Sequence, residues 1–149
     1  MPEPAAPRTL LGFDYGSKFI GVAVGQQLTG TSSPLQTIKV HDDKPDWPAI
    51  GRLIETWRPD ALVVGIPLHM DGREQEMTHA ARRFAKRLEG RYHLPVYETD
   101  ELLTSLAADR IISGQQGGRR KPVDKDRIHQ VSAQLILDTF LTEIRNKTL

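Results

Sequence analysis

The feature that most constrains the fold is a continuous apolar run, Ala61-Leu62-Val63-Val64-Gly65-Ile66, which ends at Pro67. A run this short and this apolar favours a β-strand that is buried on both faces. Segments with helical spacing lie before and after it. Residues 47–57 repeat apolar side chains at helical intervals behind a possible N-cap at Asp46, and residues 74–91 carry one apolar stripe. The sequence therefore predicts a parallel crossover, with helices on the faces of a sheet.

The rest of the chain extends this sheet. Three strand-like segments with glycine turns between them come first, which favours an antiparallel meander. A last strand follows the second helix, then a helix over about 104–113 and a long, broadly buried helix over about 125–145. The prediction is an α/β protein with a five-stranded mixed sheet, three antiparallel strands and then parallel strands, flanked by helices. This order matches the RNase H-like fold. The predicted strands cover residues 10–14, 19–26, 29–40, 61–66 and 95–100.

Composition limits the classes of function. The chain has 149 residues, and we expect a disordered tail over 1–8 and a single domain over 9–149. It has no cysteine, which excludes disulfides and cysteine-ligated zinc and suits the cytoplasm, where we expect it to act. No segment approaches the roughly 20 apolar residues of a membrane span, so we expect no membrane partner. A net charge of +1 does not by itself indicate a nucleic-acid binder.

Acidic side chains stand at the ends of predicted strands. Asp14 ends the first strand before a glycine turn, and Asp100 and Glu101 end the last one. Hydrolysis of a phosphodiester by two metal ions requires carboxylates from separate elements to converge, which these would do if the two strands lie near each other. The C-terminal helix offers Asp126 and His129 on one face as a further ligand. Aspartate supplies the oxygen that magnesium prefers, and a neutral imidazole binds metals or moves a proton.

Each of these residues also has a simpler explanation. Asp14 could order a tight turn, because aspartate shortly before glycine is common there. Asp100 could cap the next helix, Glu101 could be a first-turn acid favoured by the helix dipole, and Asp126 could play either role. His129 could be a core histidine with one hydrogen bond. Residue type alone does not decide between these interpretations.

Basic side chains gather in two places. The loop Arg119-Arg120-Lys121 follows two glycines and precedes the last helix, and phosphate binding there would weaken steeply with salt. The second basic group lies along the second predicted helix and consists of Arg82, Arg83, Lys86 and Arg87. Such a row of charges on a helix is by default a solvent-exposed face. We therefore expect the loop to be the better candidate for contact with nucleic acid.

Two motifs carry a resemblance to a known family. The segment Asp14-Tyr15-Gly16-Ser17-Lys18-Phe19-Ile20-Gly21-Val22-Ala23 is similar to the pattern D-x-G-x-K-x-x-G-V-A. Residues 65–72, Gly-Ile-Pro-Leu-His-Met-Asp-Gly, are similar to G-x-P-x-x-x-D-G. On these motifs, and over nearly its whole length, the chain resembles the YqgF family, whose members are associated with pre-16S ribosomal RNA cleavage and Holliday junction resolution.

The resemblance implies a metal-dependent endonuclease of the RNase H-like fold. Its cofactor would be a divalent metal, Mg²⁺ or Mn²⁺, and its partner a nucleic acid, either a ribosomal RNA precursor or branched DNA. Junction resolution would also require a homodimer. The implied metal ligands are Asp14, Glu101 and His129, and the implied catalytic residues are these three and Asp126. The implied substrate-binding residues are Lys18, Arg119, Arg120, Lys121 and Lys125.

Two positions depart from the family pattern. The stretch D-E-R-L-[ST]-[ST] reads Asp100-Glu101-Leu102-Leu103-Thr104-Ser105, so Leu102 replaces an arginine. The motif K-x-x-x-D aligns with residues 125–129, so His129 stands where a carboxylate is expected. Three hypotheses remain open: Asp126 substitutes for the carboxylate, His129 acts as a ligand or general acid, or the protein binds nucleic acid without cutting it.

Overall fold

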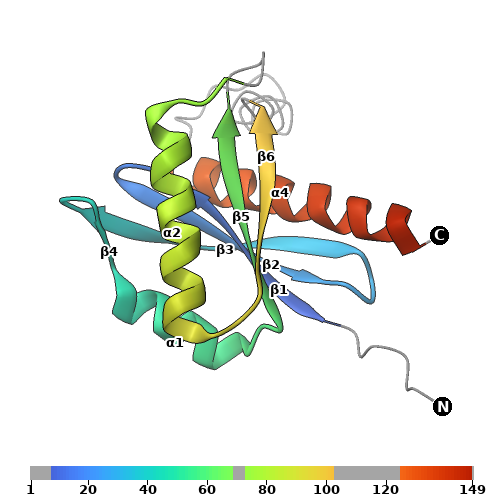
Figure 1. The fold of residues 1–149 in the computed structure, drawn as a ribbon. Helices are drawn as coiled ribbons and strands as arrows, with labels where there is room; N and C mark the ends of the chain where they lie inside the picture. Colours follow the sequence, from blue (N-terminus) through green and yellow to red (C-terminus); the bar gives the residue numbers. More distant parts are fainter. Residues whose placement is uncertain (1–7, 69–72, 103–124, 149) are drawn as a thin grey trace, which may run out of the picture.

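The structure, a computed structural model, describes residues 8–68, 73–102 and 125–148. Six strands form one sheet in the order β4-β3-β2-β1-β5-β6 (Figure 1). The elements are β1 (Thr9–Tyr15), β2 (Phe19–Gln26), β3 (Thr31–His41), β4 (Lys44–Pro45), α1 (Trp47–Trp57), β5 (Ala61–Leu68), α2 (Glu76–Tyr92), β6 (Val96–Leu102) and α4 (Lys125–Thr148).

The pairing of the strands confirms the predicted mixed sheet. β1, β2 and β3 pair in antiparallel fashion, whereas β1, β5 and β6 run parallel. The predicted number of five strands was wrong, because β4 pairs with the end of β3 as a sixth. Asp42 and Asp43 join them with φ values of 50° and 61°, the left-handed conformation of a two-residue hairpin turn. A strand of two residues is too short to show any periodicity in the sequence.

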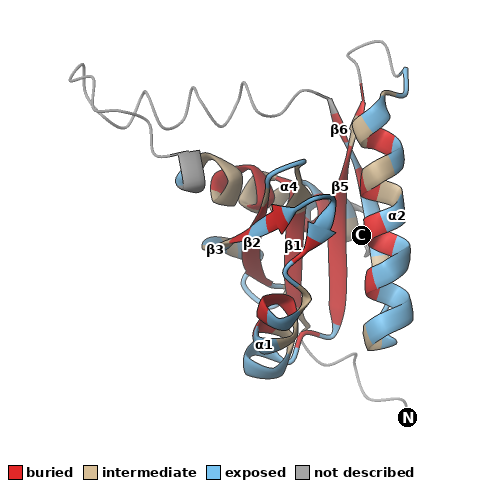
Figure 2. Ribbon diagram, turned by 90° about the vertical axis from the view of Figure 1, so that its left-hand side faces the viewer, coloured by how far each residue is buried: buried red, intermediate tan, exposed pale blue. Residues whose placement is uncertain are grey.

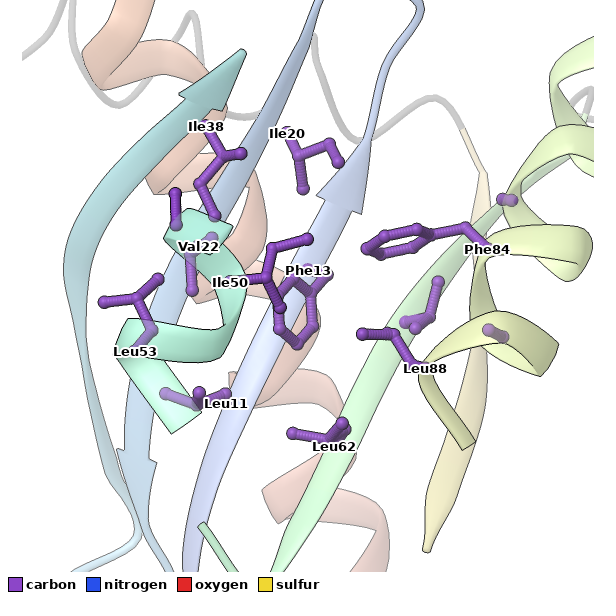
Figure 3. Close-up of a cluster of buried hydrophobic side chains, with 14 of the residues drawn as sticks. Leu11, Phe13, Ile20, Val22, Ile38, Ile50, Leu53, Leu62, Phe84 and Leu88 are labelled. Atoms are coloured by element: carbon purple, nitrogen blue, oxygen red, sulfur yellow. The ribbon is translucent and has the colours of Figure 1, made fainter. Parts of the chain in front are cut away.

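Helices cover both faces of the sheet (Figure 2). α1 and α2 pack on one face, where Phe13 meets Ile50 of α1 and Phe84 of α2 in a single hydrophobic cluster (Figure 3). α4 packs on the other face, where Val63 of β5 belongs to a second cluster with Ile136. Since Leu62 and Val64 face the first cluster, β5 is buried on both sides, as its apolar run predicts.

Hydrogen bonds at the N-termini fix where α1 and α2, the two helices that share a face of the sheet, begin. The Asp46 side chain accepts a hydrogen bond from the Ala49 amide at 3.2 Å and so caps α1 at the predicted position. At the start of α2, the Thr78 hydroxyl accepts from the Gln75 amide at 2.9 Å and donates to the Pro67 carbonyl. These bonds fix the first turn of α2 against the end of β5.

α4 lies very close to the sheet. A Cβ added to Gly21 of β2 would overlap the main-chain carbonyl of His129, so the two backbones meet directly. Polar contacts with β3 hold the same turns of the helix. Gln130 Nε2 donates to Thr37 Oγ1 and Gln134 Nε2 donates to the Ser32 carbonyl, each at 3.1 Å. Gly21 therefore sets how closely α4 approaches the sheet near the ends of its strands.

Several expectations concern residues outside the described part of the chain. These are most of the tail over 1–8, the helix over about 104–113 and the basic loop that follows it. α4 has 24 residues, yet neither it nor any other described helix has an apolar stretch long enough to cross a membrane.

Candidate active site

Asp14 and Glu101 converge on the α4 face of the sheet. Asp14 lies one residue before the end of β1, and Glu101 one residue before the end of β6. Tyr97, four residues before Glu101, stacks its ring 5.1 Å from that of Phe140 in α4, and strand alternation puts Glu101 on the same side. The two carboxyl groups hydrogen-bond with each other. The sequence predicted that these two acids meet, and the structure brings them into contact.

Gly65 makes this contact possible. β5 lies between β1 and β6, and Gly65 pairs with Asp14 on one side and with Thr99 on the other. A Cβ at this position would lie 2.8 Å from Glu101 Oε2 and would overlap Ile136 Cδ1. The Glu101 carboxyl group thus crosses β5 above a residue without a side chain. Sequence reasoning missed this role, although a glycine inside a strand often marks a close approach.

Burial raises the pKa values of both carboxyl groups, and repulsion by the Asp14 charge adds to this effect at Glu101. Glu101 is only 6% exposed, whereas Asp14 keeps partial exposure. Burial raises the pKa of Asp14 to about 7, against the lowering effect of its hydrogen bond with Glu101. Burial, the neighbouring Asp14 charge and the same hydrogen bond raise the pKa of Glu101 to about 9. Near neutral pH the pair therefore holds at least one proton, which Glu101 donates to Asp14.

Asp100 takes no part in this pair. It is exposed, and strand alternation turns it to the α2 face. There its charge, with that of Glu98, acts on the guanidinium of Arg82 in α2. Of the two adjacent acids at the end of β6, Glu101 alone reaches Asp14.

His129 lies one strand away from Asp14. It is half-buried in α4, its ring centroid is 5.6 Å from that of Phe19, and its carbonyl rests over Gly21, the β2 partner of Asp14. Among the side chains that the structure describes, which do not include that of Asp126, no three histidine, aspartate or glutamate groups form a cluster that could hold a metal. Two of the predicted metal ligands meet in this geometry, and the role of His129 stays a prediction.

The other predicted site residues divide into two groups. Lys18 is exposed in the turn between β1 and β2, beside the end of the strand that carries Asp14. Lys125 and Asp126 begin α4, but their side chains, like that of Leu102, are outside the described part of the structure. Residues 119–121, with the basic loop, also lie outside it.

The donor groups present here fit a divalent cation. Two carboxyl groups in contact, one buried and one half-buried, need either a proton or a positive charge between them, and carboxylate oxygens are the ligands that Mg²⁺ prefers. A buried hydroxyl lies on the same face: Thr99 is two residues before Glu101, and its Oγ1 has no hydrogen-bond partner within the described residues. An oxygen left without a partner beside an acid pair is suited to a hydrated cation.

Known proteins share sequence or fold with this chain. The model of the RuvX family, described as a Holliday junction resolvase, matches residues 8–143. A relative from Nitrosococcus oceani, named "Putative pre-16S rRNA nuclease", is 50% identical over 144 residues, which cover 95% of this chain and 91% of that protein. A relative of the same name from Azotobacter vinelandii is 49% identical over 142 residues, with 93% and 96% covered.

Two solved structures have the same fold at low identity. RuvC of T. thermophilus in complex with a Holliday junction substrate gives a TM-score of 0.52 at 16% identity, over 92% of this chain and 95% of that one. The fowlpox virus Holliday junction resolvase gives 0.54 at 13% identity, over 91% and 99%. The predicted RNase H-like fold is confirmed. The family model and the relatives at about 50% identity show that the chain belongs to the RuvX (YqgF) family of nucleases.

Proposed function

We propose that this protein is a metal-dependent endonuclease that hydrolyses phosphodiester bonds in a ribosomal RNA precursor, at the 5′ end of pre-16S RNA. The observation that carries the proposal is the buried, hydrogen-bonded pair of Asp14 and Glu101 at the ends of two strands. The choice of substrate is supported by the names of relatives that share half of their residues with this chain. The cytoplasm is the compartment that we expect.

The carboxylates of Asp14 and Glu101 would hold Mg²⁺ or Mn²⁺. When bound, a divalent cation polarises a phosphoryl oxygen and lowers the pKa of water near it. Glu101 would release its proton to solvent if both carboxylates became ligands, because a positive charge would then replace that proton between them. The Thr99 hydroxyl, which has no hydrogen-bond partner among the described residues, would be available to orient water beside the pair.

His129 completes the site from α4 in this proposal. Its main chain lies against Gly21, next to Asp14 in the sheet, so its helix turn borders the acid pair. A neutral imidazole suits either a ligand or a group that protonates the leaving oxygen. Asp126, one turn earlier, is the alternative. Lys18, Lys125 and the loop residues Arg119, Arg120 and Lys121 would neutralise phosphates of the substrate.

The test is cleavage of an end-labelled pre-16S RNA fragment with Mg²⁺ or Mn²⁺. We expect Asp14→Asn and Glu101→Gln each to lower the rate at least about 100-fold, the upper range for loss of a group that only supports a metal ligand. Asp100→Asn is the matched control, since it removes a neighbouring carboxylate on the opposite face. Equal loss in the control and the pair variants would contradict the assignment.

A four-way DNA junction belongs in the same assay, because the family model and the fowlpox protein are named as Holliday junction resolvases and the RuvC structure holds a Holliday junction substrate. Cleavage of the junction without cleavage of RNA would move the substrate to branched DNA and would call for a homodimer, which sedimentation measures. If folded wild-type protein binds both substrates and cuts neither, the protein is a non-catalytic binding factor of ribosome assembly.

A further inference from the structure

A pocket of about 450 Å³ opens on the face of the sheet opposite the acid pair. It lies between the end of β1, the β3–β4 hairpin and the part of α2 from Glu76 to Arg87. Its volume falls within the range of sites that hold small molecules or single building blocks of larger ones. The residues that give it chemical character are Tyr15, Phe84, Arg83, Arg87, Asp43 and Glu76.

Aromatic rings form one wall of this pocket. The ring of Tyr15 lies 5.0 Å from that of Phe84, which is only 2% exposed. Phe84 in turn contacts Phe13 at 5.6 Å and Trp47 at 5.8 Å. Because Tyr15 rests on a buried aromatic cluster, it is held in place before any ligand arrives. A fixed and partly exposed ring is a suitable surface for stacking a base.

Two guanidinium groups face the same pocket. Arg83 and Arg87 are four residues apart in α2 and both are exposed. Within the described part of the chain, neither forms a hydrogen bond or an ion pair, whereas Arg82 binds Glu74 at 2.5 Å and Arg91 lies 4.1 Å above the Trp47 ring. The same helix thus has arginines with partners elsewhere and, at the pocket, two that have none among the described residues. Unpaired guanidinium groups are the usual binding groups for phosphate.

The acidic residues narrow the class of ligand. Asp43 and Glu76 also line the pocket, so its positive and negative side chains balance. Their presence disfavours a bare anion. A nucleotide suits the mixture better, because its phosphate accepts hydrogen bonds from arginines while the amino groups of its base donate them to carboxylates.

The turn between β1 and β2 connects this pocket with the candidate active site. Tyr15 follows Asp14 directly in the chain, with its side chain on the other face. Ser17 lines the pocket and Lys18 is exposed beside it. A nucleic-acid strand that passes over this turn would therefore reach both places.

We propose that the pocket binds one nucleotide of the substrate strand, with its base against Tyr15 and its phosphate held by Arg83 and Arg87. The assignment of this strand to a nuclease substrate rests on the function proposed above. The pocket would then set how the strand enters the site and which nucleotide lies a short distance from the cleaved bond.

The test measures binding apart from cleavage. Fluorescein-labelled single-stranded RNA is titrated with protein in EDTA and followed by anisotropy. We expect the double variant Arg83→Ala/Arg87→Ala to bind at least about tenfold more weakly than the wild type, as for lost hydrogen bonds to a charged group. The slope of log affinity against log salt should also decrease by about 0.7 for each phosphate contact that is lost.

The matched control is Arg52→Ala/Lys86→Ala, which removes two exposed charges that do not line the pocket. Tyr15→Leu should weaken binding without changing the salt slope, because stacking involves no counterion. RNA that carries 4-thiouridine should cross-link under light to the peptide containing Tyr15. Melting temperatures confirm that each variant is folded.

Cleavage by the wild type, measured in parallel, separates the two proposals. If the arginine pair variant binds as well as the control, the pocket proposal is overturned, even when the wild type cuts RNA. If the pair variant binds weakly and cross-linking marks Tyr15, the pocket proposal holds, even when the wild type cuts nothing and the nuclease proposal fails.

Discussion

Glu101 hydrogen-bonds with Asp14 although the whole of β5 separates their strands. The contact crosses β5 at Gly65, where a side chain would collide with both Glu101 and Ile136. A residue with no functional group of its own therefore controls the distance between two reactive groups.

Replacement of this glycine should damage both stability and activity. Gly65→Ala places a methyl group against Ile136 Cδ1 and 2.8 Å from Glu101 Oε2. Overpacking of this kind costs about 1–3 kcal/mol, which urea denaturation measures, and the displaced carboxyl group should slow cleavage. Gly90→Ala is the control, because nothing lies within 4 Å of a Cβ there. It should stabilise α2 by about 0.5–1 kcal/mol. Equal stability of the Gly65 variant and the wild type would contradict the prediction.

The metal-free protein should lose stability as pH rises. Asp14 and Glu101 have ordinary pKa values of 3.8 and 4.5, raised on folding to about 7 and about 9. Between these limits the folded state holds more protons than the unfolded chain. The contribution of the pair is complete below the ordinary values and disappears as pH passes through the folded ones. We expect the melting temperature in EDTA to fall between about pH 5 and about pH 9.

Addition of Mn²⁺ should reverse this loss. A cation that binds the folded state alone raises the melting temperature, and it competes less with protons at high pH. The increase should therefore be larger near pH 8 than near pH 5, and Asp14→Asn should remove most of it. A melting temperature that is insensitive to Mn²⁺ at every pH would argue against a metal at this pair.

The Thr99 hydroxyl should matter to the cation more than to the fold. Its Oγ1 is buried and has no partner within the described residues, so Thr99→Val should leave stability unchanged or raise it by up to about 1 kcal/mol in EDTA. The affinity for Mn²⁺, followed by calorimetry, should fall about 10-fold or more. Thr78→Val is the contrasting variant. Its hydroxyl has two hydrogen bonds, and its loss should cost about 1–3 kcal/mol. Unchanged Mn²⁺ binding by Thr99→Val would exclude a role for this hydroxyl.

Variants of α4 should decide how the site is completed. If His129 acts as ligand or proton donor, His129→Ala should lower the cleavage rate about 100-fold, whereas Asp126→Asn should keep it. His41→Ala is the control, because His41 is exposed in the β3–β4 hairpin. The reverse pattern, with loss only in Asp126→Asn, would assign the third position to that carboxylate.

Much of the fold could be predicted from local patterns. The helix over residues 47–57 has the predicted bounds, because Asp46 provides a cap and apolar residues repeat at helical spacing. The apolar run from Ala61 predicts a strand covered on both faces, which β5 is. β4 was missed because two residues carry no period, and its turn uses aspartates in a left-handed conformation that glycine or asparagine would have signalled more clearly.

The site was predicted less completely. Sequence reasoning identified Asp14 and Glu101 but assumed that their strands lie near each other, whereas β5 separates them and Gly65 opens the path. Registers between distant strands are not encoded in any local pattern. From the sequence, the basic row on α2 was interpreted as one solvent-exposed face. In the structure, Arg82 pairs with Glu74, whereas Arg83 and Arg87 line a pocket. Which arginine forms an ion pair and which lines the pocket depends on the strand ends against which α2 packs, and the helical pattern alone does not show this.

The close packing of α4 against the sheet has a consequence for when the candidate site forms during synthesis. Because the carbonyl of His129 rests directly on Gly21 and Ile136 covers Gly65, the helix has one position on the sheet. All six strands precede it in the chain. During synthesis, Asp14 and Glu101 would stay exposed to water until this helix emerges and docks, and they would lack both the burial and the third group that the proposed reaction would use. A nascent chain would therefore be harmless to the RNA of the ribosome that makes it, and cutting ability would arrive with the final helix.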